Sequence, residues 1–68
     1  MTRFFIEPEQ MTSQFLVLTG ENAAHAKVLR LKAGERVLVC DGAGNECECT
    51  ISDVSQDRIS LVVNSRQA

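Results

Sequence analysis

The chain has 68 residues, 44% of them hydrophobic, and a formal net charge of −2. A chain of this length makes one domain and buries only about 60% of the surface that its unfolded form exposes, so we expect a small core. No apolar run approaches the roughly 20 residues of a membrane helix, and the first ten residues lack a secretory core. These absences favour a cytoplasmic protein.

Two short strands are predicted in the first nineteen residues. Residues 3–6 form an aromatic-rich segment that should end before Pro8, because proline cannot continue a hydrogen-bonded ladder, and it should lie at a sheet edge. Residues 14–19 alternate Phe15, Val17 and Thr19 with Leu16 and Leu18. Since this second strand is apolar on nearly both faces, we expect both faces to be well covered.

A helix is predicted from about Glu21 to about Leu31. Thr19 or Gly20 should open it, and Gly34 is the natural stop just beyond its end. At 100° per residue, the predicted buried stripe contains Ala24, Val28 and Leu31 with Leu29 at its margin, while Ala26, Lys27 and Arg30 lie on the other side.

Three further strands are predicted after the helix. Residues 36–40 and 46–51 should form a hairpin around the turn 41–45, whose sequence DGAGN has typical turn residues. Residues 58–64 make the last strand. The inward-facing side chains should be those of Cys47, Cys49, Ile51, Ile59, Leu61 and Val63. Five short strands and one helix predict a mainly β protein, a small closed or half-closed β-barrel with one packed α-helix.

Four of the seven basic residues lie within ten positions: Lys27, Arg30, Lys32 and Arg36. One interpretation is a surface that contacts the phosphates of a nucleic acid. The other is that the cations complement the negative end of the helix, at about 0.3–1 kcal/mol each, and that Arg36 is simply solvated. The pattern alone slightly favours the second interpretation, with Arg30 as the exception.

Other residues offer less chemistry. His25 should be partly buried and hydrogen-bonded, and a structural role is favoured over a contact with RNA or phosphate. The three cysteines (Cys40, Cys47 and Cys49) lack the spacing of metal or redox motifs, so we predict no disulfide framework and no metal site. The turn 41–44 resembles half of a phosphate loop but leads into a strand. All three phenylalanines lie in apolar settings, which argues against a platform for base stacking.

Several short motifs, in this order, resemble the ribosomal RNA small subunit methyltransferase E family. They are Arg3-Phe4-Phe5, His25, Val28-Leu29-Arg30-Leu31, Gly34-Glu35, and Asp41-Gly42-Ala43-Gly44-Asn45-Glu46. The resemblance covers nearly the whole chain and implies that residues 1–68 form the family's N-terminal PUA-like RNA-binding domain. It also implies a parent enzyme that uses S-adenosylmethionine to methylate N3 of a uridine in 16S rRNA within the small ribosomal subunit.

The same resemblance places the catalytic and cofactor residues in a C-terminal SPOUT domain beyond Ala68, which would also form most of a homodimer. No catalytic or cofactor-binding residue is therefore assigned here. The resemblance selects Arg3 and Arg30 as RNA contacts, and the remaining nucleic-acid-binding candidates are His25, Lys27, Lys32 and Arg36. The alternative function is a self-contained small β-barrel that acts as a protein-interaction or assembly module without enzymatic activity.

Overall fold

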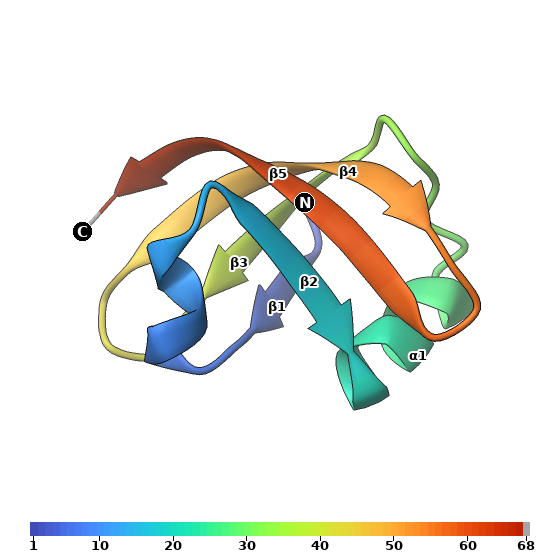
Figure 1. The fold of residues 1–68 in the computed structure, drawn as a ribbon, viewed down its shortest axis with the longest axis horizontal. Helices are drawn as coiled ribbons and strands as arrows, with labels where there is room; N and C mark the ends of the chain where they lie inside the picture. Colours follow the sequence, from blue (N-terminus) through green and yellow to red (C-terminus); the bar gives the residue numbers. More distant parts are fainter. Residues whose placement is uncertain (68) are drawn as a thin grey trace.

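A computed structural model describes residues 1–67 as one five-stranded sheet with an α-helix and a short 3₁₀-helix (Figure 1). The strands are β1 (Arg3–Phe5), β2 (Phe15–Thr19), β3 (Arg36–Cys40), β4 (Glu46–Val54) and β5 (Arg58–Gln67); the helices are η1 (Pro8–Thr12) and α1 (Gly20–Val28). Neither helix has the length and hydropathy to cross a membrane.

The strand order in the sheet is β1-β3-β4-β5-β2. Strands β3, β4 and β5 form an antiparallel meander, β1 adds in parallel to β3, and β2 adds antiparallel to β5. Two irregularities in the β4–β5 register, between Glu48 and Cys49 and between Ile51 and Asp53, increase the local twist. Figure 1 shows the resulting curl, with β1 and β2 at the two sides of a half-open barrel. The predicted mainly β, half-closed barrel with one packed helix is confirmed.

The core lies inside the curl and takes alternate residues from every strand. Phe4 projects inward from β1, and Leu16 and Leu18 from β2. The predicted inward residues of the last two strands are all buried: Cys47, Cys49, Ile51, Ile59, Leu61 and Val63. Strands β4 and β5 each run three residues further than predicted, to Val54 and Gln67.

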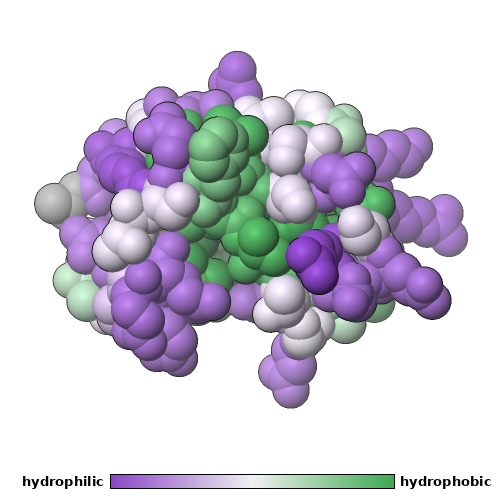
Figure 2. Space-filling view, in the orientation of Figure 1, coloured by the Kyte–Doolittle hydropathy of each residue, from purple (hydrophilic) through white to green (hydrophobic). Residues whose placement is uncertain are grey.

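The outer face of β2 corrects one prediction. We expected both faces of this strand to be covered, but Phe15 is 67% exposed and Val17 is 42% exposed. Strand β2 is an edge strand, and within residues 1–67 its outer face stays uncovered, because the buried side of α1, Ala23 and Ala26, packs into the core. Hydrophobic side chains therefore gather in the middle of this face of the molecule, as Figure 2 shows.

The helix also differs from its prediction. It ends at Val28 rather than near Leu31, and its buried residues are Ala23 and Ala26. Ala24 is exposed and Val28 is 78% exposed, so the predicted stripe was wrong. The reason is length: a nine-residue helix anchored by two small alanines rotates its larger apolar residues away from the barrel. Leu31 still packs against the core, but from beyond the helix end.

Candidate nucleic-acid interface

The end of α1 determines where the basic side chains leave the barrel. The N–H of Leu31 donates to the carbonyl of Ala26 (3.1 Å), and the N–H of Arg30 donates to the carbonyl of Lys27 (2.9 Å). This pair of bonds is a Schellman cap, in which the residue that follows the C-cap adopts a left-handed conformation. Here that residue is Arg30, with φ 58°. The predicted stop, Gly34, was wrong, because the helix ends before it.

The loop after the cap is tied to β4 rather than being free. The N–H of Gly34, which has φ 95°, donates to the carbonyl of Ile51 at 2.7 Å. The N–H of Ile51 donates to the carbonyl of Glu35 at 2.8 Å in return. Glu35 also accepts the backbone N–H of Lys32 through Oε2 at 2.5 Å. The backbone that carries the cations is therefore fixed at both ends.

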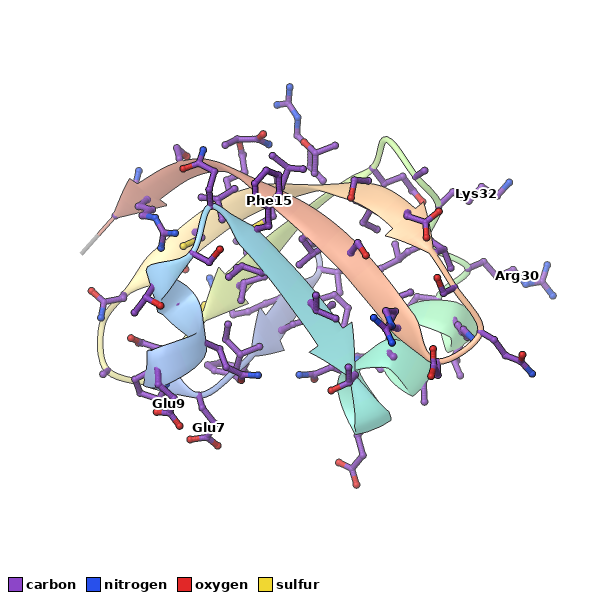
Figure 3. All side chains as sticks on the ribbon, in the orientation of Figure 1. Glu7, Glu9, Phe15, Arg30 and Lys32 are labelled. Atoms are coloured by element: carbon purple, nitrogen blue, oxygen red, sulfur yellow. The ribbon has the colours of Figure 1, made fainter. Side chains whose placement is uncertain are left out.

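Four exposed cations surround this loop: Lys27, Arg30, Lys32 and Arg36, which we call the basic cluster. Among residues 1–67, the ion pairs join Arg3 to Glu46 and Arg58 to Asp57, and neither involves the basic cluster. Figure 3 shows Arg30 and Lys32 extending from one end of the molecule, whereas Glu7 and Glu9 lie near the other. Arg30 and Lys32 thus lie far from these two glutamates.

The geometry weakens the helix-end explanation for most of the basic cluster. Because α1 stops at Val28, only Lys27 lies in its last turn, where a cation complements the negative helix end. Arg30 and Lys32 lie beyond the helix, and Arg36 begins β3. Lys27 also lines a shallow hollow with Asp57, so an acidic residue lies near this cation.

Arg3 is placed differently from the basic cluster. It pairs in register with Leu38, two residues along β3 from Arg36, so both arginines lie on the outer face of the sheet. Its Nη2 is 3.2 Å from Oε2 of Glu46, and both side chains are partly exposed. Arg3 is therefore already paired with a carboxylate, whereas Arg30 forms no ion pair among residues 1–67.

His25 was predicted to be partly buried and hydrogen-bonded, and this was wrong. The residue is exposed, and within residues 1–67 its imidazole makes no hydrogen bond. Its ring instead meets Phe4 edge to face, with centroids 5.7 Å apart and planes at 70°. This edge-to-face contact joins α1 to β1 and differs from the buried, hydrogen-bonded role that the sequence predicted.

The hairpin turn between β3 and β4 satisfies its own backbone. Oδ1 of Asp41 accepts the N–H groups of Ala43 (2.7 Å) and Asn45 (3.2 Å), and Oδ2 accepts Nδ2 of Asn45 (2.7 Å). The Asn45 side chain, followed by these backbone donors, holds the pKa of Asp41 below its usual value. Since Asp41 already takes these N–H groups, the turn does not form a phosphate loop, and the predicted hairpin is confirmed.

The cysteines are core residues. Cys47 and Cys49 are fully buried, and burial raises the pKa of Cys49 to about 11. Burial, followed by a hydrogen bond to Glu46, also raises the pKa of Cys40. Over residues 1–67, no group of three or more His, Cys, Asp or Glu side chains is placed to hold a metal ion.

Arg66 is an architectural residue that the sequence did not reveal. Its guanidinium donates to the carbonyl of Met11 through Nη1 and to that of Ser13 through Nη2. It thereby ties η1 and the residue that follows it to β5. The sequence signal was missing because β5 was expected to end at Asn64, which left Arg66 in a tail.

The fold and the position of the cations can now be compared with known proteins. A family model of the RNA methyltransferase PUA domain matches residues 18–64. The fold and this match define the class of the chain as an RNA methyltransferase PUA domain. The ribosomal RNA small subunit methyltransferase E of Bacillus subtilis (strain 168) is 33% identical over 70 residues, covering 93% of this chain and 26% of that protein. The chain belongs to the PUA-like domains of the ribosomal RNA small subunit methyltransferase E family, as its motifs predicted.

Solved structures agree with this assignment. A Legionella pneumophila methyltransferase with bound S-adenosylmethionine is 26% identical, with a TM-score of 0.85 over 98% of this chain and 28% of that one. The methyltransferase E of Neisseria gonorrhoeae, also bound to S-adenosylmethionine, is 20% identical and shares the fold, with a TM-score of 0.87 over 100% of this chain and 29% of that one. The chain thus spans about a quarter of the length of these relatives.

Proposed function

We propose that this chain is the RNA-binding, substrate-positioning domain of a larger enzyme that methylates N3 of a uridine in 16S rRNA. The observation that carries this proposal is the unpaired basic cluster on a fixed loop, in a chain of the RNA methyltransferase PUA family. Each cation that neutralises an RNA phosphate releases a condensed counterion, which favours binding at low salt. The hydrogen-bonded loop fixes the backbone that carries these cations before RNA binds.

The methyl donor of the proposed enzyme is S-adenosylmethionine. Relatives solved with this cofactor support the assignment, and this chain covers only about 28–29% of their length. We assign no residue of this chain to the cofactor or to methyl transfer. The proposed enzyme acts on the small ribosomal subunit in the cytoplasm during ribosome biogenesis, as a homodimer held together mainly by the part outside residues 1–68.

RNA binding is tested by titrating the 68-residue chain with a stem-loop fragment of 16S rRNA at several salt concentrations. For a four-phosphate contact, log K should fall against log salt with a slope of about −3 to −4. Changing all four basic-cluster residues to alanine should remove most of this slope. An affinity that does not depend on salt, or a slope unaffected by the fourfold change, would show that the basic cluster is not the RNA contact.

Positioning is tested in the full-length methyltransferase that carries this domain. Arg30→Ala should lower kcat/KM for small ribosomal subunits about tenfold and leave the affinity for S-adenosylmethionine unchanged, because the change removes a contact with RNA only. Nucleoside mass analysis of the treated 16S rRNA should show N3-methyluridine. Another methylated nucleoside would contradict the proposed chemistry and leave RNA binding standing.

One observation favours the alternative of a protein-interaction module. Phe15 and Val17 are exposed side by side on an edge strand, and such strands can accept a partner chain. The reading frame that encodes the chain separates the two functions. Roughly 170 further residues with a glycine-rich C-terminal motif would support the methyltransferase, and a stop codon after Ala68 would support the module.

A further inference from the structure

A second hollow lies on the outer face of the sheet, separate from the basic cluster. It is formed by the ends of β1 and β3, the start of β4 and the hairpin turn, and it measures about 260 Å³. The side chains used below are Arg3, Phe5 and Glu46, with Gly42 and Gly44 at its rim. A hollow of this size is smaller than a typical drug-sized site and suits one small planar group.

Phe5 forms an aromatic wall of this hollow. The residue is 60% exposed, although burying a phenylalanine ring would stabilise the fold. Its backbone is held firmly: the Phe5 carbonyl accepts Nδ2 of Asn22 at 2.8 Å, and the next N–H, of Ile6, donates to the carbonyl of Cys40 at 2.9 Å. An exposed ring on a fixed backbone is ready to stack without a large loss of entropy.

Arg3 and Glu46 supply polar groups beside this ring. Arg3 lies two residues before Phe5 on the same face, and its guanidinium is held by Oε2 of Glu46. Among residues 1–67, Oε1 of Glu46 accepts no hydrogen bond, so it is open to an N–H donor. The carboxylate would repel a phosphate placed over it, which leaves the arginine side of the hollow for the RNA backbone.

The two glycines at the rim of the hollow leave its entrance open. Gly42 and Gly44 have φ values of 76° and 96°, and a Cβ atom added to either would meet no other atom within 4 Å. Open space above these two residues lets a ligand approach the turn closely. The hollow therefore offers a stacking ring, a cation, an open hydrogen-bond acceptor and an unobstructed entrance.

We propose that this hollow binds one unpaired nucleotide of the RNA, whose base stacks on Phe5 and donates an N–H group to Glu46. Arg3 contacts the adjoining phosphate. The proposal rests on the proposed function, because it takes RNA as the ligand. The expectation against a stacking platform rested on enclosed phenylalanines, whereas Phe5 and Phe15 are exposed. Paired bases stay within their own stack, so this site would recognise only unpaired nucleotides.

The test compares two RNAs and uses the 68-residue chain. One RNA is a hairpin with a single-stranded loop of mixed sequence, and the other is the same stem as a blunt duplex. Phe5→Leu should weaken binding to the hairpin about tenfold and leave binding to the duplex within twofold, because leucine keeps the apolar volume and loses the aromatic face. Phe5→Tyr should bind the hairpin like the unaltered chain.

Phe15→Leu is the matched control. Phe15 is similarly exposed, but it lies on β2, the other edge strand, where it pairs with Val62 of β5. Phe15→Leu should change neither the affinity for the hairpin nor that for the duplex. Arg30→Ala should weaken both RNAs, so it reports on the proposed function independently of Phe5.

Each outcome decides the proposal. If Phe5→Leu binds the hairpin as tightly as the unaltered chain while Arg30→Ala weakens both RNAs, the nucleotide site is wrong and the RNA-binding function stands. An equal loss for both RNAs would also overturn the site, since stacking requires an unpaired base. If the unaltered chain binds neither RNA, both proposals fail. Should Phe5→Leu not fold, shifts of the Phe5 ring protons on adding AMP to the unaltered chain support the site, and their absence overturns it.

Discussion

The segments before and after β3 both contain backbone with positive φ: the turn after β3 uses only glycines, whereas the segment before it uses Gly34 and also Arg30. At the C-terminal end, the hairpin turn uses Gly42 and Gly44 at φ 76° and 96°, and Asp41 bonds the backbone around them. In the segment before β3, the cap of α1 places Arg30 at φ 58°. This position usually carries glycine, because a Cβ atom makes the left-handed conformation costly by about 1–2 kcal/mol.

This difference distinguishes residues that set the path of the backbone from a residue whose side chain we expect to bind. Glycine serves wherever only the path of the chain matters, as in the hairpin turn. At the helix end, glycine would adopt the left-handed conformation at lower cost, so we expect the arginine to contribute through its side chain. Strain of this kind is retained where the surrounding structure imposes it, and it concentrates at functional sites. In this chain it occurs in the middle of the basic cluster.

The largest predicted effect on stability is at the hairpin turn. Asp41→Ala removes the acceptor of three hydrogen bonds and leaves the N–H groups of Ala43 and Asn45 without a protein partner. We expect the melting temperature to fall by roughly 10 °C, with salt-dependent RNA binding unchanged at temperatures where the variant is folded. Asp53→Ala is the matched control in the other hairpin, where the carboxylate accepts only the Ser55 hydroxyl, and it should have little effect. Equal melting temperatures for both variants would contradict this account.

Arg30 should show the opposite behaviour. Arg30→Gly should weaken RNA binding about tenfold and raise the free energy of unfolding by about 1 kcal/mol, because glycine relieves the left-handed strain. Arg30→Ala removes the same charge but keeps the Cβ atom, so it should lose the same affinity without the gain in stability. Chemical denaturation and RNA titration measure the two effects. A loss of stability in Arg30→Gly would mean that the arginine is needed for folding.

Acid should weaken the hairpin turn selectively. The pKa of Asp41 is lower in the fold than its unfolded value of about 3.9. The charged carboxylate therefore stabilises the fold fully above about pH 4, and this contribution is lost as the pH falls through the lowered pKa. Asp41→Ala lacks the contribution at every pH, so its difference in melting temperature from the unaltered chain should narrow as the pH falls below about 4. A constant difference would show that the charge is unimportant.

The smallest effects should come from single lysines. Lys32→Ala should reduce the salt slope of RNA binding by about 0.7–0.9, the contribution of one phosphate contact. Lys27→Ala should do less, because Asp57 lies across the same hollow. Arg58→Ala is the control, since Arg58 is paired with Asp57 at 3.7 Å, and it should leave the slope unchanged.

Local chemistry explains which parts of the fold could be predicted. The turn 41–45 was predictable because its aspartate and glycines determine the conformation without help from distant residues. The end of α1 was not, because the left-handed position is occupied by Arg30, whereas the sequence pointed to Gly34. The 3₁₀-helix η1 was missed because a five-residue helix shows no periodicity.

The candidate site was predictable only as a list of charges. Periodicity along residues 15–19 could not distinguish a covered face from an exposed one, because this choice depends on where the single helix packs. For the same reason the exposure of Phe5 and Phe15 was missed. The pairing of Arg3 with Glu46 joins residues far apart in the chain, so sequence spacing could not separate Arg3 from the unpaired cations.

The strand order has a consequence for the way the chain folds. Strands β3, β4 and β5 are joined by short turns, so they pair with little loss of loop-closure entropy. Strands β1 and β2 must return to opposite edges of this meander from the start of the chain, and such distant pairings form slowly. We therefore expect residues 36–67 to be ordered in the folding transition state and the first nineteen residues to dock last. During refolding, the amides of β1 and β2 should gain protection from exchange later than those of β3, β4 and β5.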